Sequence, residues 1–156
     1  MSFLSRAKTE RDAAMTTVEL AEAQGFVPYS RGMKLVPGDR VYTVNHGKSV
    51  ILAVIGRDGL DTGAHILAAH IDSPRLDLKP MPMYEDKKEL VYLKTHYYGG
   101  IKKYQWTAIP LELRGVVALT GGGVVNVEIG AKPGDPVFTI TDLLPHLGKD
   151  QSAKTL

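Results

Sequence analysis

The sequence predicts an α/β protein, and three observations carry this prediction. Helical periodicity occupies roughly the first 25 residues, β-rich runs begin at residue 41, and residues 64–70 are almost all apolar. A continuous apolar run of this kind is typical of a central strand that is covered on both faces. A helix, paired strands and a buried strand in this order indicate an α/β layer, which we expect to extend to residue 80.

The N-terminal segment is predicted to be a helix because charged and apolar residues alternate along it at helical spacing. Ser2 or Ser5 is expected to cap its start. Gly25 stands where a C-terminal cap belongs, and Pro28 follows shortly after it.

Residues 41–44 and 49–56 are two β-rich runs separated by an Asn/Gly turn, so they predict a hairpin. The buried strand is expected at residues 64–70. One helix and about three strands cannot cover both faces of such a sheet. The sequence therefore resembles the opening of a larger domain whose remainder is missing.

Short β segments dominate after residue 80. Pro80, Pro82 and the charged run 85–89 predict a boundary, with an α/β part over residues 1–80 and a β-rich part over residues 81–156. Gly121–Gly123 lacks the helix and Lys of a phosphate loop and is predicted to be a hairpin turn. The expected strands cover residues 90–94, 111–119, 124–129 and 137–140.

Composition excludes several classes of protein. The 156 residues contain no Cys, which removes disulfides, thiolate metal sites and Cys nucleophiles. A net charge of +2 gives no support to nucleic-acid binding. No apolar run approaches the roughly 20 residues that cross a bilayer, and no signal-peptide core is visible. We expect a soluble cytoplasmic protein with no nucleic-acid or membrane partner.

The chemistry is expected at His70 and Asp72, where the predicted buried strand ends. Imidazole is the commonest transition-metal ligand, and a nearby carboxylate can fix its tautomer. A strand-end His that is simply satisfied by its neighbouring carboxylate is the alternative, and from spacing alone it is the commoner arrangement. His65 is expected to pack in the strand, and His146 to lie among apolar neighbours.

Three blocks of sequence resemble the M18 metallo-aminopeptidases, the aspartyl aminopeptidase family. The first is Ala-Ala-His-Ile-Asp-Ser-Pro at residues 68–74. The second joins Tyr98-Gly99-Gly100 to Trp106 and to residues 110–117, and the third is Asp-Leu-Leu-Pro-His-Leu at residues 142–147. The blocks occur in the family's order. The N-terminal helix at Phe3-Leu4 and the Gly25-Phe26 pair are also similar to the family in character, so the resemblance extends over almost the whole chain.

The resemblance implies a two-metal aminopeptidase that removes N-terminal residues, often acidic, from peptides with a metal-activated water. His70 would bind one of two zinc ions, with cobalt or manganese as alternatives. Asp72 would be the catalytic carboxylate that supports this metal centre. Residues 81–156 would form an incomplete insertion that makes the dimer contact of a homo-oligomer, and His146 would reach the neighbouring subunit's active site.

The chain also departs from the family. One imidazole cannot build a metal site, because catalytic sites commonly use about three protein ligands per ion. The remaining ligands of relatives lie beyond the position of Leu156, so we expect the chain alone to be inactive without a C-terminal catalytic portion. Ala108-Ile109 replaces the family's Asp-Arg, which argues against strict acidic specificity. The alternative is a catalytically silent oligomerisation fragment.

Overall fold

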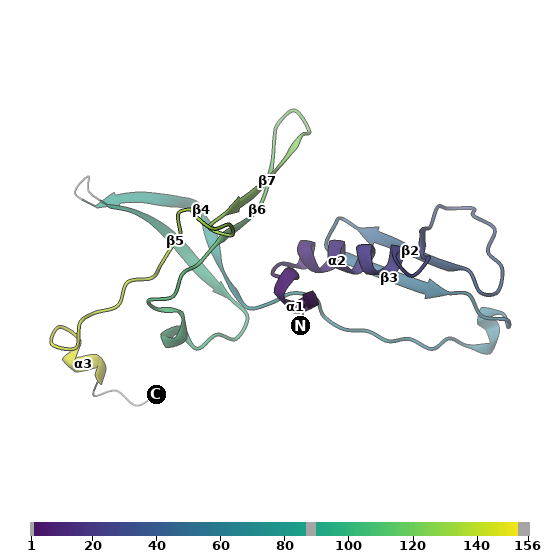
Figure 1. Ribbon diagram of the computed structural model, residues 1–156, viewed down its shortest axis with the longest axis horizontal. Helices are drawn as coiled ribbons and strands as arrows, with labels where there is room; N and C mark the ends of the chain where they lie inside the picture. Colours follow the sequence, from purple (N-terminus) through teal and green to yellow (C-terminus); the bar gives the residue numbers. More distant parts are fainter. Residues whose placement is uncertain (1, 87–89, 153–156) are drawn as a thin grey trace. The chain divides into compact units, whose positions relative to one another are not determined.

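The computed structural model describes residues 2–86 and 90–152 and divides into two compact units, Met1–Gly99 and Gly100–Leu156. The described residues form a mixed α/β structure with one three-stranded and two two-stranded sheets (Figure 1). Strand β4 (Arg75–Asp86) crosses residue 80, so the predicted boundary falls inside a strand. The assignment of residues 81–156 to a separate insertion stays a prediction.

The predicted N-terminal helix is two helices, α1 (Ser2–Arg6) and α2 (Glu10–Glu22). The cap expected at Ser2 or Ser5 is wrong for the long helix, which Thr9 caps instead. The Thr9 hydroxyl accepts from the Asp12 backbone N–H at 3.2 Å, and the Asp12 carboxylate accepts from the Thr9 backbone N–H at 3.1 Å. This reciprocal pair satisfies two donors that the first helical turn leaves unpaired.

Gly25 ends α2 as predicted. Its φ of +81° is left-handed, and the Phe26 backbone N–H returns to the Ala21 carbonyl at 3.0 Å. This arrangement satisfies carbonyls that the last turn leaves free. In the part of the chain that the structure describes, no helix combines the length and the apolar character that a membrane crossing requires.

The predicted hairpin is confirmed as β2 (Arg40–Asn45) and β3 (Ser49–Val54), and β1 (Val27–Pro28) adds a parallel edge to it. His46 and Gly47 form the turn with φ values of +50° and +67°. The Lys48 backbone N–H closes the turn on the Asn45 carbonyl at 3.0 Å. Two consecutive positive φ values match the right-handed twist of the strands, which explains the glycine at position 47.

Helix α2 lies along the β2–β3 hairpin (Figure 1). The buried apolar residues of this unit are small: Ala13, Ala14 and Ala21 on the helix and Val41 on the sheet, with the polar Thr16 also buried on the helix. The Tyr42 hydroxyl donates to the Glu22 carboxylate at 2.6 Å and so ties the sheet to the end of the helix. Small contact residues allow close approach, but the unit has only a thin core.

We expect the Tyr42 phenol to titrate above the ordinary value of 10.0, because its hydrogen bond to the Glu22 carboxylate raises its pKa. The folded-state pKa exceeds the unfolded one, so the bond's contribution to stability is complete below the ordinary value and is lost as pH rises through the folded-state pKa. Ultraviolet difference titration against Tyr42→Phe isolates this phenol. In Glu22→Gln its titration should move back toward the ordinary value; an unmoved titration would contradict the assignment.

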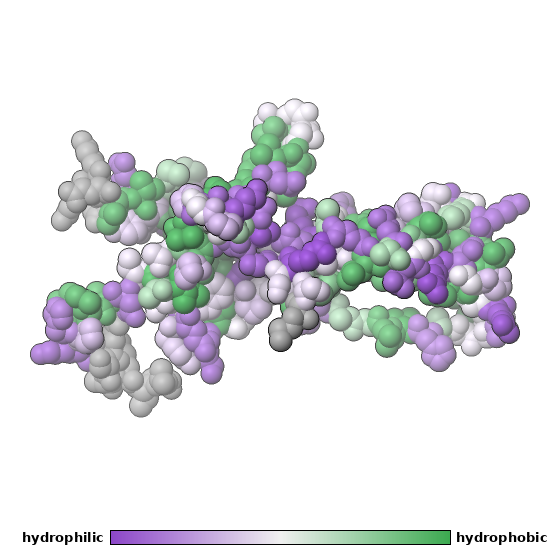
Figure 2. Space-filling view, viewed as in Figure 1, coloured by the Kyte–Doolittle hydropathy of each residue, from purple (hydrophilic) through white to green (hydrophobic). Residues whose placement is uncertain are grey.

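The buried strand predicted at residues 64–70 is wrong. In the structure this segment is an extended coil outside any sheet, and the residues Ile66 and Leu67 are 82% and 101% exposed. Figure 2 shows apolar surface along this extended segment. An apolar strand needs hydrogen-bonded neighbours and covering helices. Within residues 2–86 and 90–152 the segment has no strand partner, so its apolar pattern stays uncovered.

Strand β4 (Arg75–Asp86) pairs in antiparallel fashion with β5 (Leu90–Tyr98). Pro80 and Pro82, which we expected to mark a boundary, lie inside β4. The register shifts between Leu78 and Met83, and both prolines fall in that irregularity. Proline lacks the N–H that a regular ladder needs, and a bulge is one of the places where a strand accepts it.

The second unit contains the hairpin of β6 (Leu113–Ala118) and β7 (Val124–Ile129). Its turn is the predicted glycine run, in which the Gly122 backbone N–H donates to the Leu119 carbonyl at 2.9 Å. The strand predicted at residues 137–140 is reduced to an isolated bridge between Phe138 and Leu111. Short helical segments complete the described chain: η1 (Leu60–Thr62), η2 (Lys103–Trp106) and α3 (Lys149–Ser152).

Candidate functional site

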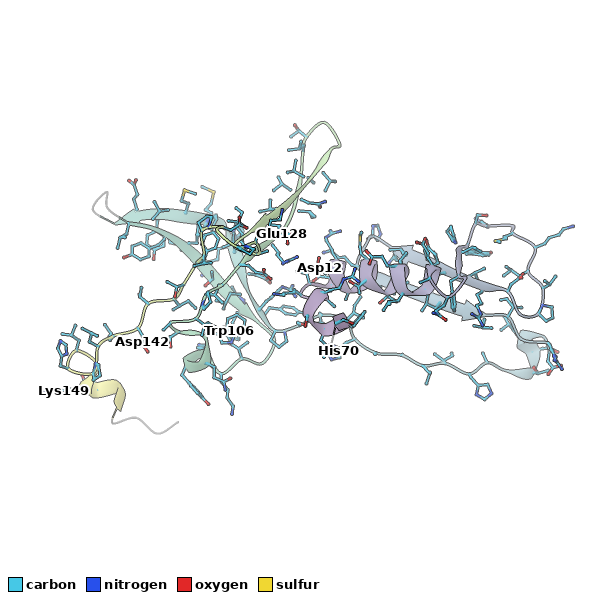
Figure 3. The ribbon with its side chains drawn as sticks, in the orientation of Figure 1. Asp12, His70, Trp106, Glu128, Asp142 and Lys149 are labelled. Atoms are coloured by element: carbon cyan, nitrogen blue, oxygen red, sulfur yellow. The ribbon has the colours of Figure 1, made fainter. Side chains whose placement is uncertain are left out.

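His70, labelled in Figure 3, is the last residue of the extended segment 64–70, and Asp72 follows it in the coil before the start of β4. The coil that carries them ends where Arg75 begins pairing with β5. The His70 side chain is 84% exposed and the Asp72 side chain 41%. The predicted pair is therefore presented at the surface of the first unit, where an imidazole is accessible to an incoming ligand.

The structure brings His70 and Asp72 into direct contact. His70 Nδ1 lies 3.1 Å from Asp72 Oδ1 and 3.1 Å from the Asp72 backbone carbonyl oxygen. Both partners are acceptors, so we assign the proton of the neutral imidazole to Nδ1. This tautomer leaves the lone pair on Nε2, which is the form in which a histidine binds a metal while a carboxylate orients it.

Tyr98 holds the other oxygen of the Asp72 carboxylate. The Tyr98 hydroxyl donates to Asp72 Oδ2 at 2.9 Å. This bond is the largest cause of a lowered Asp72 pKa, and the Asp72 backbone amide and His70 lower it further. The same bond raises the pKa of the Tyr98 phenol. Asp72 is therefore an anion and Tyr98 a neutral phenol at neutral pH, which makes the hydrogen bond charge-assisted.

Arg75 supports Tyr98 from the opposite strand. The two residues are direct partners in the β4–β5 register, and the Arg75 guanidinium carbon lies 4.1 Å from the centre of the Tyr98 ring. The Arg75 Nε donates to Asp77 at 2.7 Å, and its Nη1 lies 3.6 Å from the Glu10 carboxylate on α2. The guanidinium is thus held in place over the ring by two carboxylates and a cation–π contact.

Sequence reasoning did not assign a role to Tyr98 or Arg75. Tyr98 was visible only as the first residue of a Tyr-Gly-Gly block, and Arg75 only as the residue after Pro74. Their roles depend on a cross-strand register that the misread prolines of β4 concealed. The pairing of β4 with β5 brings Tyr98 within hydrogen-bond distance of Asp72, although the two residues are 26 positions apart in the sequence.

The glycine after Tyr98 is required by the backbone. Gly99 has φ of +76°, and a Cβ added there would lie 3.4 Å from the Pro74 Cα. The Gly99→Ala substitution should therefore destabilise the fold by about 1–2 kcal/mol, from the left-handed backbone strain. Gly100→Ala is the matched control, because a Cβ there meets nothing within 4 Å and its φ is not positive. Denaturant unfolding of both variants tests this; equal midpoints would refute it.

The residues present fit a zinc ion only in part. The His70 imidazole is a donor that suits zinc, and its orientation by Asp72 is the usual outer-shell arrangement. Among the residues that the structure describes, however, there is no group of three or more His, Asp or Glu side chains that could hold a metal. The role of His70 as a zinc ligand, with Asp72 as its supporting carboxylate, stays a prediction.

His146 belongs to the second unit. It lies in a turn in which the backbone N–H groups of Leu147 and Gly148 donate to the Leu144 carbonyl at 2.8 and 3.0 Å. Its side chain is exposed. The proposed action of His146 on a neighbouring active site stays a prediction. His65, which we expected to pack, is exposed on the extended segment.

Nearly the whole chain is similar to known proteins. The family model described as "Aminopeptidase I zinc metalloprotease (M18)" covers residues 3–156. A protein of Clostridium acetobutylicum named "Probable M18 family aminopeptidase 1" is 47% identical over 98% of this chain, which corresponds to 34% of that relative. The chain therefore spans about a third of the length of the curated relatives it matches.

Solved structures agree with the sequence comparison. An M18-family aminopeptidase from Thermotoga maritima is 48% identical, with a TM-score of 0.87 over 96% of this chain and 33% of that one. Aminopeptidase I from Borrelia burgdorferi B31 is 44% identical, with a TM-score of 0.84 over 91% of this chain and 35% of that one. The chain belongs to the M18 family of zinc metalloproteases.

Proposed function

We propose that this chain is the N-terminal portion of a two-metal aminopeptidase that removes N-terminal residues, acidic ones included, from peptides. The observation that carries the proposal is the His70–Asp72 pair, in which a carboxylate fixes the imidazole with Nε2 available as a ligand. Membership of a zinc metalloprotease family supports zinc as the ion. The other ligands would come from the part of the enzyme that this chain does not match.

In this proposal the chain's own residues prepare one side of the metal centre. Asp72 stays ionised, holds the His70 proton at Nδ1 and directs the Nε2 lone pair outward. With His70 as one of its ligands, a zinc ion would supply polarisation of a scissile carbonyl and a lowered pKa for a water molecule. Orientation of a ligand before the metal binds reduces the ordering that binding requires, which is the contribution that outer-shell carboxylates make.

The remaining expectations belong to the same proposal. Residues 81–156 form the insertion that makes the dimer contact of a homo-oligomer, His146 acts in the neighbouring subunit's active site, and the enzyme works in the cytoplasm. Exposed apolar side chains on the β4–β5 ribbon support the oligomer, because a lone two-stranded ribbon is marginally stable in water. They include Met81, Met83 and Leu90, at 85%, 72% and 58% exposure.

These same exposed residues favour a second candidate, an oligomerisation fragment without catalytic activity. To separate the two, we would join the chain to the part of the Thermotoga maritima relative that it does not match, which gives a joined enzyme. The enzyme proposal expects zinc binding and peptide hydrolysis by the joined enzyme. If the joined enzyme is folded and oligomeric but neither binds zinc nor hydrolyses peptides, the result would favour the oligomerisation fragment over the enzyme. The relative's own enzyme serves as the positive control.

A further inference from the structure

We infer that Tyr98, held by Arg75, is a positioning residue that fixes the Asp72 carboxylate and thereby the imidazole of His70. The inference rests on the proposed function for its catalytic consequence, but its geometry stands apart from that function. The two oxygens of Asp72 have different partners: Oδ1 faces His70 Nδ1 at 3.1 Å, and Oδ2 accepts from Tyr98 at 2.9 Å.

One contact on a carboxylate leaves rotation about its Cβ–Cγ bond, and a second contact on the other oxygen removes it. His70 and Asp72 are exposed and lie in coil, so their own packing supplies little of this constraint. Tyr98 supplies the constraint because it lies in a paired strand: it is the last residue of β5 and pairs with Arg75, the first residue of β4. A residue of a sheet therefore fixes a side chain that lies in coil.

Tyr98 is itself fixed from a second direction. The Arg75 guanidinium stacks on the Tyr98 ring at 4.1 Å, and Asp77 and Glu10 hold that guanidinium. The Tyr98→Phe substitution keeps the ring and its stacking on Arg75 but deletes the hydroxyl. It therefore separates positioning of Asp72 from a structural role of the aromatic ring. Tyr92→Phe, on the same strand, removes the hydroxyl of a ring that stacks on Tyr84, its partner in the β4–β5 register, and serves as the matched control.

The first readout is the tautomer of His70 in the 156-residue chain, measured from the ¹⁵N chemical shifts of its ring at a pH where the imidazole is neutral. We expect the Nδ1–H form in the wild type and in Tyr92→Phe. In Tyr98→Phe the Nδ1–H population should fall, because the carboxylate is then free to turn away and only the Asp72 backbone carbonyl, at 3.1 Å, still accepts from Nδ1. An unchanged tautomer in Tyr98→Phe would overturn the inference, whatever the activity of the enzyme.

The second readout is zinc affinity of the joined enzyme, measured by competition with a chelator alongside kcat and KM. Tyr98→Phe should weaken zinc binding by about tenfold or more, in the range that outer-shell substitutions produce, and lower kcat more than it raises KM. Wild-type affinity in Tyr98→Phe would overturn the link to the metal. A wild-type joined enzyme without zinc would refute the proposed function, while the tautomer readout still tests the positioning.

Discussion

The His70→Ala substitution is expected to remove one zinc ion per active site from the joined enzyme. His70 is the one ligand of the proposed centre that the chain presents with its ring oriented, and Ala has no donor atom to replace Nε2. Loss of an outer-shell partner alone costs about 10–100-fold in affinity or activity, so loss of a direct ligand should lower kcat/KM by more than about 100-fold. Elemental analysis after dialysis gives the zinc content.

The matched control for this substitution is His65→Ala. His65 lies on the same extended segment and is exposed, so its loss tests whether any histidine in the segment matters. We expect wild-type zinc content and hydrolysis in His65→Ala. Unchanged zinc content in His70→Ala, in a variant with wild-type secondary structure, would remove His70 from the ligand set.

The second large effect is expected for Asp72→Asn. Asparagine has the size of aspartate, but only one of its two terminal atoms accepts hydrogen bonds. If its oxygen accepts from Tyr98, its amide nitrogen faces His70 Nδ1 and donates to it. This contact disfavours a proton on Nδ1, for which only the residue 72 backbone carbonyl then remains as an acceptor. The tautomer with its proton on Nε2, where the metal would bind, should therefore gain population. We expect a loss of about 100-fold or more in kcat/KM with little change in the fold.

Ring ¹⁵N shifts in the Asp72→Asn chain give a check that does not depend on hydrolysis, since the His70 proton should move from Nδ1 to Nε2. Asp58→Asn, in an exposed loop of the same unit, controls for the loss of one negative charge. Full activity in Asp72→Asn, or an unmoved His70 tautomer, would contradict the role given to Asp72.

Local signals in the sequence predicted the local features of the fold well. Gly25 ends α2 with a left-handed residue, and the turn at His46–Gly47 closes the first hairpin as its composition indicated. The cap differs from the prediction at Ser2 or Ser5 because the long helix begins only at Glu10. The signal for its cap is the Thr9–Asp12 pair, three residues apart. These features depend on a few neighbouring residues, which is why the sequence suffices for them.

Features that depend on distant partners were predicted less well. Residues 64–70 have the composition of a buried strand, but the strands and helices that would bury them are not among the described residues. Pro80 and Pro82 predict a boundary, but they lie in a bulge of β4, and that bulge forms only when β4 pairs with β5. The spacing of His70 and Asp72 indicated the candidate site, whereas Tyr98 enters it only through the register of β4 and β5.

We propose that this chain carries one oriented ligand of a zinc site that residues outside it complete. The most direct test is the zinc content of the purified 156-residue chain after dialysis, with an aminopeptidase assay on acidic and neutral substrates, beside the joined enzyme. We predict neither bound zinc nor hydrolysis for the chain alone, and both for the joined enzyme. Stoichiometric zinc and peptide hydrolysis by the chain alone would contradict the claim.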